Sequence, residues 1–125
     1  MTKISSGLKT LFLVHFIFGL LFGLTYLFIP ALYMSWSGVK LADEFPYRLV
    51  GAAILAFSAG SWFCYRAAEW ERVKIVVQAE IAWTVLAVLV ALYGLLFTGL
   101  PALFWVNVII MAGFAAAFIY FYSKK

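Results

Sequence analysis

The sequence VKIVVQAEIAWTVLAVLVALYGLLF, residues Val73–Phe97, decides the fold class. This stretch is almost entirely apolar, and its single acidic residue, Glu80, lies near one end. The hydrocarbon core of a bilayer is about 30 Å thick, so a helix needs about 20 consecutive apolar residues to cross it. The stretch therefore predicts a membrane-spanning helix and not a core helix of a soluble protein.

The composition of the whole chain also indicates a protein that is surrounded by lipid. Hydrophobic residues make up 67% of the 125 residues and charged residues 11%, whereas soluble domains contain roughly 45–50% and about 25%. Phe, Tyr and Trp reach 20%, which suits lipid-facing Phe and interfacial Trp and Tyr. We therefore expect residues 1–125 to form a single transmembrane domain with the lipid bilayer as its partner. Nucleic acid is not expected as a partner, because the basic residues flank the apolar spans instead of forming one patch.

Three other apolar runs have the length of a span. The first covers residues 8–29 and stops before Pro30, which cannot donate a backbone hydrogen bond. It is longer than the apolar part of a signal peptide and no small-residue cleavage site follows it, so it is predicted to be retained. The second and fourth spans are predicted at residues 47–65 and 102–122. The short links between spans predict an all-α, integral membrane four-helix bundle with antiparallel, up-down topology.

The links between the spans carry signals of their own. Pro30 suits the first turn of a helix and Gly38 suits a helix end, so a short helix lying in the membrane interface is predicted between the first two spans. This helix acts either as an aromatic anchor or as a lid over a site that opens on that side. The second link, RAAEWERVK at residues 66–74, is predicted to be a solvated hairpin turn, and residues 98–101 a very tight one.

One face of the first span carries small residues at helical spacing. His15, Gly19, Gly23 and Tyr26 follow each other at steps of four, four and three, so they share this face. Small residues let a second helix approach closely in a membrane. The spacing therefore predicts a packing seam along Gly19 and Gly23.

The distribution of basic residues predicts the orientation. In an up-down bundle, the N-terminus, the second link and the C-terminus lie on one side, and they hold seven of the nine Lys and Arg residues. Lys40 and Arg48 lie on the other side. The positive-inside rule therefore predicts a multi-pass protein of the cell membrane with both termini in the cytoplasm.

The few polar side chains inside the spans fall into two layers. Four of them lie about 21–26 Å from the outer ends of their spans at a rise of 1.5 Å per residue, namely His15, Ser61, Cys64 and Glu80. From this cytoplasmic layer come the residues of a candidate ligand or proton site: His15, Ser61 and Glu80. A second polar layer is predicted near the outer surface, with Thr25, Tyr26, Arg48, Tyr93 and Asn107.

Two interpretations of Glu80 stay open on the sequence alone. A charge at the centre of a span costs about 2.5–3.5 kcal/mol, so Glu80 is a functional candidate that His15 modulates. If the third span instead covers residues 81–100, Glu80 lies at the interface, or it makes a purely structural hydrogen bond with His15. No cofactor or metal is predicted: a single histidine excludes bis-histidine haem within one chain, and a zinc site would need His15, Cys64 and Glu80 together.

Several short motifs carry a resemblance to a known family. They are Gly23 with the later Pro30-Ala31-Leu32, Arg48-Leu49-Val50-Gly51 at the start of the second span, and Gly60 and Arg66 near its end. Over residues 18–67 the chain resembles the small four-helix prokaryotic membrane proteins grouped as DoxX-like. The resemblance implies the four-helix membrane fold. Some relatives are associated with quinone-linked sulfur oxidation, but no motif carries a catalytic residue over to this chain.

The sequence favours a binding or accessory protein over an enzyme, because small-residue stripes run along three spans and no nucleophile–base constellation stands out. Such a protein holds a small apolar or amphipathic ligand or lipid, or docks to a membrane-protein partner or to a second copy of itself. Two alternatives stay open. One is a proton-coupled small-molecule transporter that uses Glu80 with His15, and the other is a quinone-linked membrane redox protein, which rests on the resemblance alone.

Overall fold

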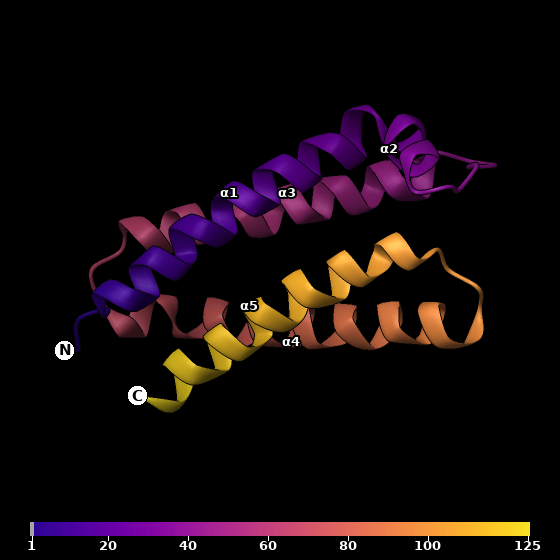
Figure 1. Cartoon of the computed structure of the whole chain (residues 1–125). Helices are drawn as coiled ribbons and strands as arrows, with labels where there is room; N and C mark the ends of the chain where they lie inside the picture. Colours follow the sequence, from indigo (N-terminus) through magenta and orange to yellow (C-terminus); the bar gives the residue numbers. More distant parts are fainter. Residues whose placement is uncertain (1) are drawn as a thin grey trace. The chain divides into compact units, whose positions relative to one another are not determined.

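The computed structural model describes residues 2–125, and within them all regular secondary structure is helical. The elements in chain order are α1 (Ser6–Phe28), α2 (Pro30–Trp36), α3 (Phe45–Arg66), α4 (Trp70–Phe97), the 3-10 turn η1 (Ala102–Phe104) and α5 (Trp105–Ser123), as Figure 1 shows. Four segments are long and apolar enough to cross a membrane: α1, α3, α4, and η1 with α5. The predicted all-α class, the four apolar helices and the short helix after the first of them are confirmed.

The chain divides into two compact units. Residues 12–66 form the central unit, and residues 2–11 with 67–125 form the terminal unit. The boundary falls inside α1, so the first turns of this helix belong with α4 and α5.

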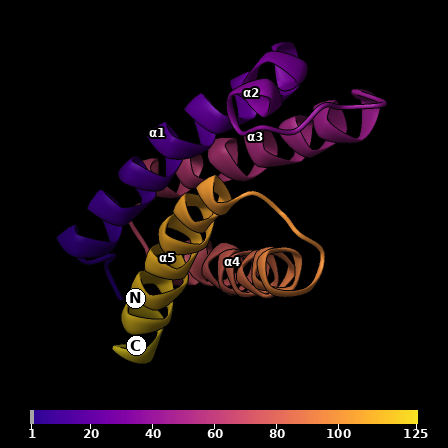
Figure 2. The same cartoon turned by 45° about the vertical axis from the view of Figure 1, so that its right-hand side comes forward.

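In the central unit, α1 and α3 lie side by side and run antiparallel (Figures 1 and 2). Residues later in α1 contact residues earlier in α3. A Cβ atom added to Gly19 would lie 2.8 Å from the Cβ of Ser58, and one added to Gly23 would lie 2.7 Å from the Cγ of Leu55. The two helices therefore approach more closely than a larger residue allows. The packing seam predicted along Gly19 and Gly23 is confirmed.

The short helix α2 starts and ends where the sequence predicts. Pro30 is its first residue, and its last turn closes with a Schellman motif. The Val39 N–H donates to the Met34 carbonyl at 2.9 Å, and the Gly38 N–H donates to the Ser35 carbonyl at 3.1 Å. Gly38 has φ +83°, which explains the need for glycine at this helix end.

In the terminal unit, the chain before α1 pairs with the chain before α4. The Trp70 N–H donates to the Thr2 carbonyl at 2.8 Å, which satisfies a backbone donor at the start of α4. The helix accordingly begins at Trp70 and not at Val73. The hairpin turn expected at residues 66–74 is therefore shorter than predicted, since only residues 67–69 lie outside helices.

The link from α4 to α5 is the predicted tight turn. Gly99 has φ +71°, and the Gly94 carbonyl accepts the N–H groups of Thr98 and Leu100, both at 3.1 Å. The 3-10 turn η1 follows, so α5 itself begins at Trp105. Within the unit, α4 and α5 pack against each other.

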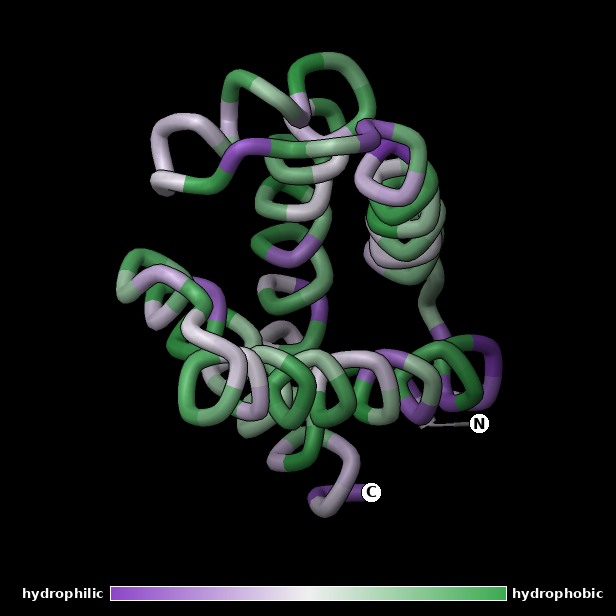
Figure 3. Tube along the Cα trace, turned by 90° about the vertical axis from the view of Figure 1, so that its right-hand side faces the viewer, coloured by the Kyte–Doolittle hydropathy of each residue, from purple (hydrophilic) through white to green (hydrophobic). Residues whose placement is uncertain are grey.

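The surface of the long helices is largely apolar. Hydrophilic residues concentrate towards the termini and the links, whereas hydrophobic residues dominate the helices (Figure 3). Large apolar side chains are widely exposed, among them Ile75 at 73%, Val90 at 71% and Phe97 at 74%. The long helices therefore expose large apolar side chains at many positions.

Candidate functional site

His15 on α1 and Ser61 on α3 form a hydrogen-bonded pair in the central unit. The Nδ1 atom of His15 and the Oγ atom of Ser61 are 2.7 Å apart, and the two residues are 5% and 0% exposed. The antiparallel register places them opposite each other, and the close contact at Gly19, one turn further along α1, holds the helices near enough for the bond. The structure thus brings together two of the three residues predicted for the cytoplasmic site.

A second polar contact crosses the same seam. The Ser58 hydroxyl donates to the Phe16 carbonyl at 2.7 Å. A helical carbonyl has a second lone pair available for such a bond. Ser58 was not among the predicted site residues, although its position three residues before Ser61 puts it on the same helical face.

Cys64 lies one turn beyond Ser61 on α3 and is 4% exposed. The C-terminal half of this helix therefore carries three small buried polar side chains, Ser58, Ser61 and Cys64. Among residues 2–125, no three His, Cys, Asp or Glu side chains are grouped as metal ligands.

The His15–Ser61 contact has a limited chemical repertoire. A serine within hydrogen-bond reach of a histidine is one arrangement for an activated nucleophile. Here the Ser61 hydroxyl is fully buried between two helices, so a substrate carbonyl has no access to it. The contact is suited to holding the helices together and to offering one donor and one acceptor if the pair opens.

Glu80 lies on α4 in the terminal unit and is 0% exposed. The buried residues of α4 follow each other at steps of three and four, as expected for one inward face: Trp70, Val73, Val77, Glu80 and Thr84. The Thr84 hydroxyl donates to the Glu80 carbonyl at 2.7 Å. Glu80 therefore lies on the inward face of α4 and not on its exposed surface.

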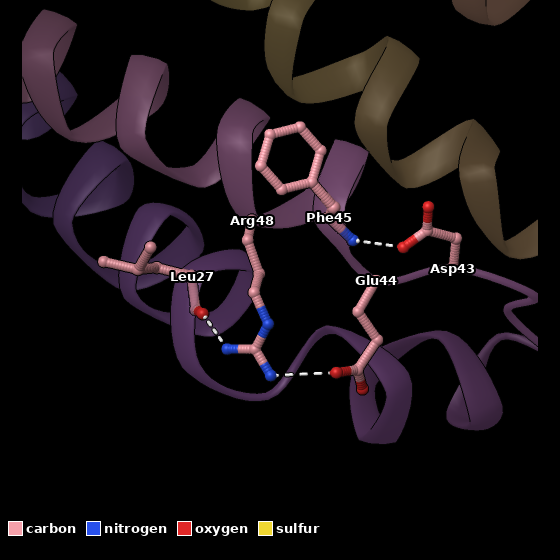
Figure 4. Close-up of polar contacts among 5 residues, drawn as sticks. All are labelled: Leu27, Asp43, Glu44, Phe45 and Arg48. Atoms are coloured by element: carbon pink, nitrogen blue, oxygen red, sulfur yellow. Dashed lines mark hydrogen bonds and ion pairs between the residues drawn. The ribbon is translucent and has the colours of Figure 1, made fainter.

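Arg48, near the start of α3, connects the end of α1 with the residues that precede α3 (Figure 4). Its Nη1 group donates to the Leu27 carbonyl in the last turn of α1, and its Nη2 group donates to the Glu44 carboxylate at 2.9 Å. The last carbonyls of a helix lack partners within the helix and carry partial negative charge, so a guanidinium group stabilises this end. The Asp43 carboxylate instead accepts the Phe45 N–H at 2.9 Å, at the start of α3.

Two other residues of the predicted outer layer, Tyr93 and Asn107, lie in the terminal unit. Tyr93 on α4 is 62% exposed, and its ring centroid lies 5.5 Å from that of Phe97. Asn107 on α5 is half-buried. No hydrogen bond joins the side chains of Tyr93 and Asn107 in the described part of the chain, residues 2–125.

Tyr26 packs against α2 instead. Its ring lies edge-on to that of Tyr33, with centroids 5.3 Å apart. Burial raises the pKa of the Tyr33 hydroxyl, and the hydrogen bond with Tyr26 opposes this shift. Tyr33 therefore stays protonated at neutral pH and acts as a hydrogen-bonding side chain of α2.

Comparisons with protein-family models, curated proteins and solved structures give no match to this chain. Its function must therefore be argued from its own residues.

Proposed function

We propose that this chain is a multi-pass membrane protein of the binding or accessory type. In this proposal the four long helices cross the cell membrane in an up-down arrangement, with both termini in the cytoplasm. The exposed apolar side chains along the helices support membrane embedding, because lipid covers such surface without cost. The proposal includes membership of the DoxX-like group that the sequence resembles.

The proposed orientation can be tested with single cysteines. Cys64→Ser removes the native thiol. Lys40→Cys in the α2–α3 link and Lys124→Cys after α5 then each add one reporter, and the proposed topology puts the two on opposite sides of the membrane. We expect a membrane-impermeant maleimide to label Lys40→Cys in intact cells and Lys124→Cys only after lysis. The reverse pattern would refute the orientation, and recovery of the protein in the soluble fraction would refute the embedding.

The ligand is proposed to be a small apolar or amphipathic molecule. The observation that supports this proposal is the His15–Ser61 hydrogen bond. It lies between two largely apolar helices, where a buried polar pair offers a contact for the polar end of a ligand. Its closed state leaves both groups satisfied, and its opening would expose one donor and one acceptor to the ligand.

Native mass spectrometry of the protein extracted mildly from its membrane tests this role. We expect a co-purifying small molecule or lipid on the wild type and on Thr25→Ala, and its loss on His15→Ala. Thr25 is a matched control, because its hydroxyl donates to the Leu21 carbonyl of its own helix at 2.7 Å. A wild-type protein without bound molecule, or equal occupancy in His15→Ala, would contradict the proposal.

A second candidate function is a proton-coupled small-molecule transporter. It is favoured by the complete burial of the Glu80 side chain on the inward face of α4. An ionisable side chain within a span is by default a functional candidate. We expect Glu80→Gln to abolish proton-driven accumulation of ethidium in proteoliposomes. Glu71→Gln is the control, since it removes the same charge from an exposed position at the start of the helix. If the wild type moves no ethidium, or Glu80→Gln moves it equally well, this candidate is excluded.

A further inference from the structure

Three stretches that are distant in the sequence meet at one end of the terminal unit. The Ile4 N–H donates to the Ala68 carbonyl at 3.1 Å, which ties the start of the chain to the beginning of α4. The Lys125 ammonium group donates to the Lys3 carbonyl at 3.1 Å. Residues that precede α1, open α4 and follow α5 are therefore fixed beside each other.

The terminal unit carries a positive net charge, because its six Lys and Arg residues outnumber its acidic residues, Glu69, Glu71 and Glu80. The basic residues of the terminal unit are Lys3, Lys9, Arg72, Lys74, Lys124 and Lys125. Arg72 pairs with Glu69 at 3.3 Å, whereas none of the five lysines makes an ion pair within residues 2–125. The opposite end of the unit, residues 97–105, contains no charged residue. All the basic side chains thus lie away from that end. We call Lys3, Lys74, Lys124 and Lys125 the terminal basic cluster.

Aromatic rings hold two of these cations in place. The Lys125 ammonium lies 5.6 Å from the centroid of the Trp70 ring, and the Lys124 ammonium lies 5.3 Å from that of Tyr120. Cation–π contacts at this distance restrict where the ammonium groups point. Tyr side chains prefer the headgroup level of a bilayer, so Tyr120, which is 54% exposed, would mark the depth at which the cluster meets lipid.

We propose that the terminal basic cluster binds the headgroup of an anionic phospholipid. Lysines without protein counter-charges attract such headgroups at the cytoplasmic surface. The cluster also borders apolar surface, because Ile75, the residue after Lys74, is 73% exposed. A phospholipid can contact both the lysines and the apolar surface, whereas free phosphate can contact only the lysines. The inference rests on the membrane embedding proposed above.

Retention of lipid by the purified full-length protein tests this inference. Native mass spectrometry compares phosphatidylglycerol with phosphatidylcholine of the same acyl chains. We expect the wild type to retain phosphatidylglycerol preferentially, and Lys125→Gln to weaken this retention about fivefold, as expected for one cation near an anionic surface. Lys40→Gln is the matched control, because it removes the same charge from the α2–α3 link and should leave retention unchanged.

Further measurements distinguish lipid binding from a purely structural role of Lys125 and from a simple phosphate site. Lys74→Gln should also weaken retention, which a purely structural role of the Lys125–Lys3 bond would not explain. Inorganic phosphate at millimolar concentration should not displace the lipid, and displacement would show a simple phosphate site and overturn the proposal. Equal retention of the two lipids, or equal effects of Lys125→Gln and Lys40→Gln, would also overturn it. If the protein stays in the membrane fraction in these cases, the proposed embedding survives and only the lipid inference fails.

Discussion

The two units pack apolar helices in different ways. In the central unit, added Cβ atoms on Gly23 and Gly51 would lie 2.7 Å and 2.6 Å from atoms of the facing helix. In the terminal unit, a Cβ on Gly113 of α5 would have no neighbour within 4 Å. Gly23 and Gly51 are therefore required for the close approach of α1 and α3, whereas Gly113 is a surface position of α5. Gly7 is a close position in the terminal unit, since a Cβ added there would lie 2.7 Å from the Phe121 ring.

The two units also differ in where their cross-helix polar contacts lie. In the central unit, the His15–Ser61 bond is buried and crosses between helices. In the terminal unit, the Gln78 amide donates to the Tyr122 hydroxyl at 3.0 Å in an exposed position, and the Thr84 hydroxyl bonds within its own helix. Polar groups thus fix the register of α1 and α3 from inside, whereas the α4–α5 pair has its cross-helix amide–phenol bond at the surface.

The largest effect is expected for Gly51→Ala. Its Cβ would lie 2.6 Å from the Leu27 nitrogen and 2.9 Å from the Gly23 carbonyl oxygen, and backbone atoms cannot rotate away. Overpacking of this kind costs about 1–3 kcal/mol. Denaturation in a fixed detergent, followed by circular dichroism, should show this loss. Wild-type stability in the variant would mean that α1 and α3 do not approach as closely as described.

A smaller effect is expected when the buried polar pair is removed. Hydrogen bonds between membrane helices contribute about 0.6 kcal/mol on average and at most about 1.7 kcal/mol. A double-mutant cycle with His15→Ala, Ser61→Ala and the combined variant should give a coupling energy of this size. Strictly additive losses would show that the two side chains do not interact in the folded protein.

The smallest effect, and the only gain, is expected for Gly113→Ala. The new methyl group meets open space, and alanine is favoured over glycine inside a helix by up to about 1 kcal/mol. The same denaturation assay should therefore show slightly higher stability, opposite in sign to Gly51→Ala. A clear loss of stability would mean that the exposed face of α5 contacts a partner, such as a second copy of the chain.

Local patterns in the sequence are sufficient for the four long helices and for some of their ends. Chain length and hydropathy identify four apolar helices, Pro30 marks the end of the first, and Gly38 and Gly99 mark turns that need positive φ. The start of α4 was placed too late, because the bond from Trp70 to Thr2 joins residues that are far apart in the sequence.

The sequence by itself determined the all-helical class, the apolar surface and a short set of polar candidates, because helix length and periodicity are properties of neighbouring residues. Only the tertiary structure decided that His15 meets Ser61, that Arg48 caps the end of α1, and that Lys125 lies over Trp70. These contacts depend on how each helix is rotated and on the register between helices. Close packing between distant segments sets both, and no local pattern encodes them.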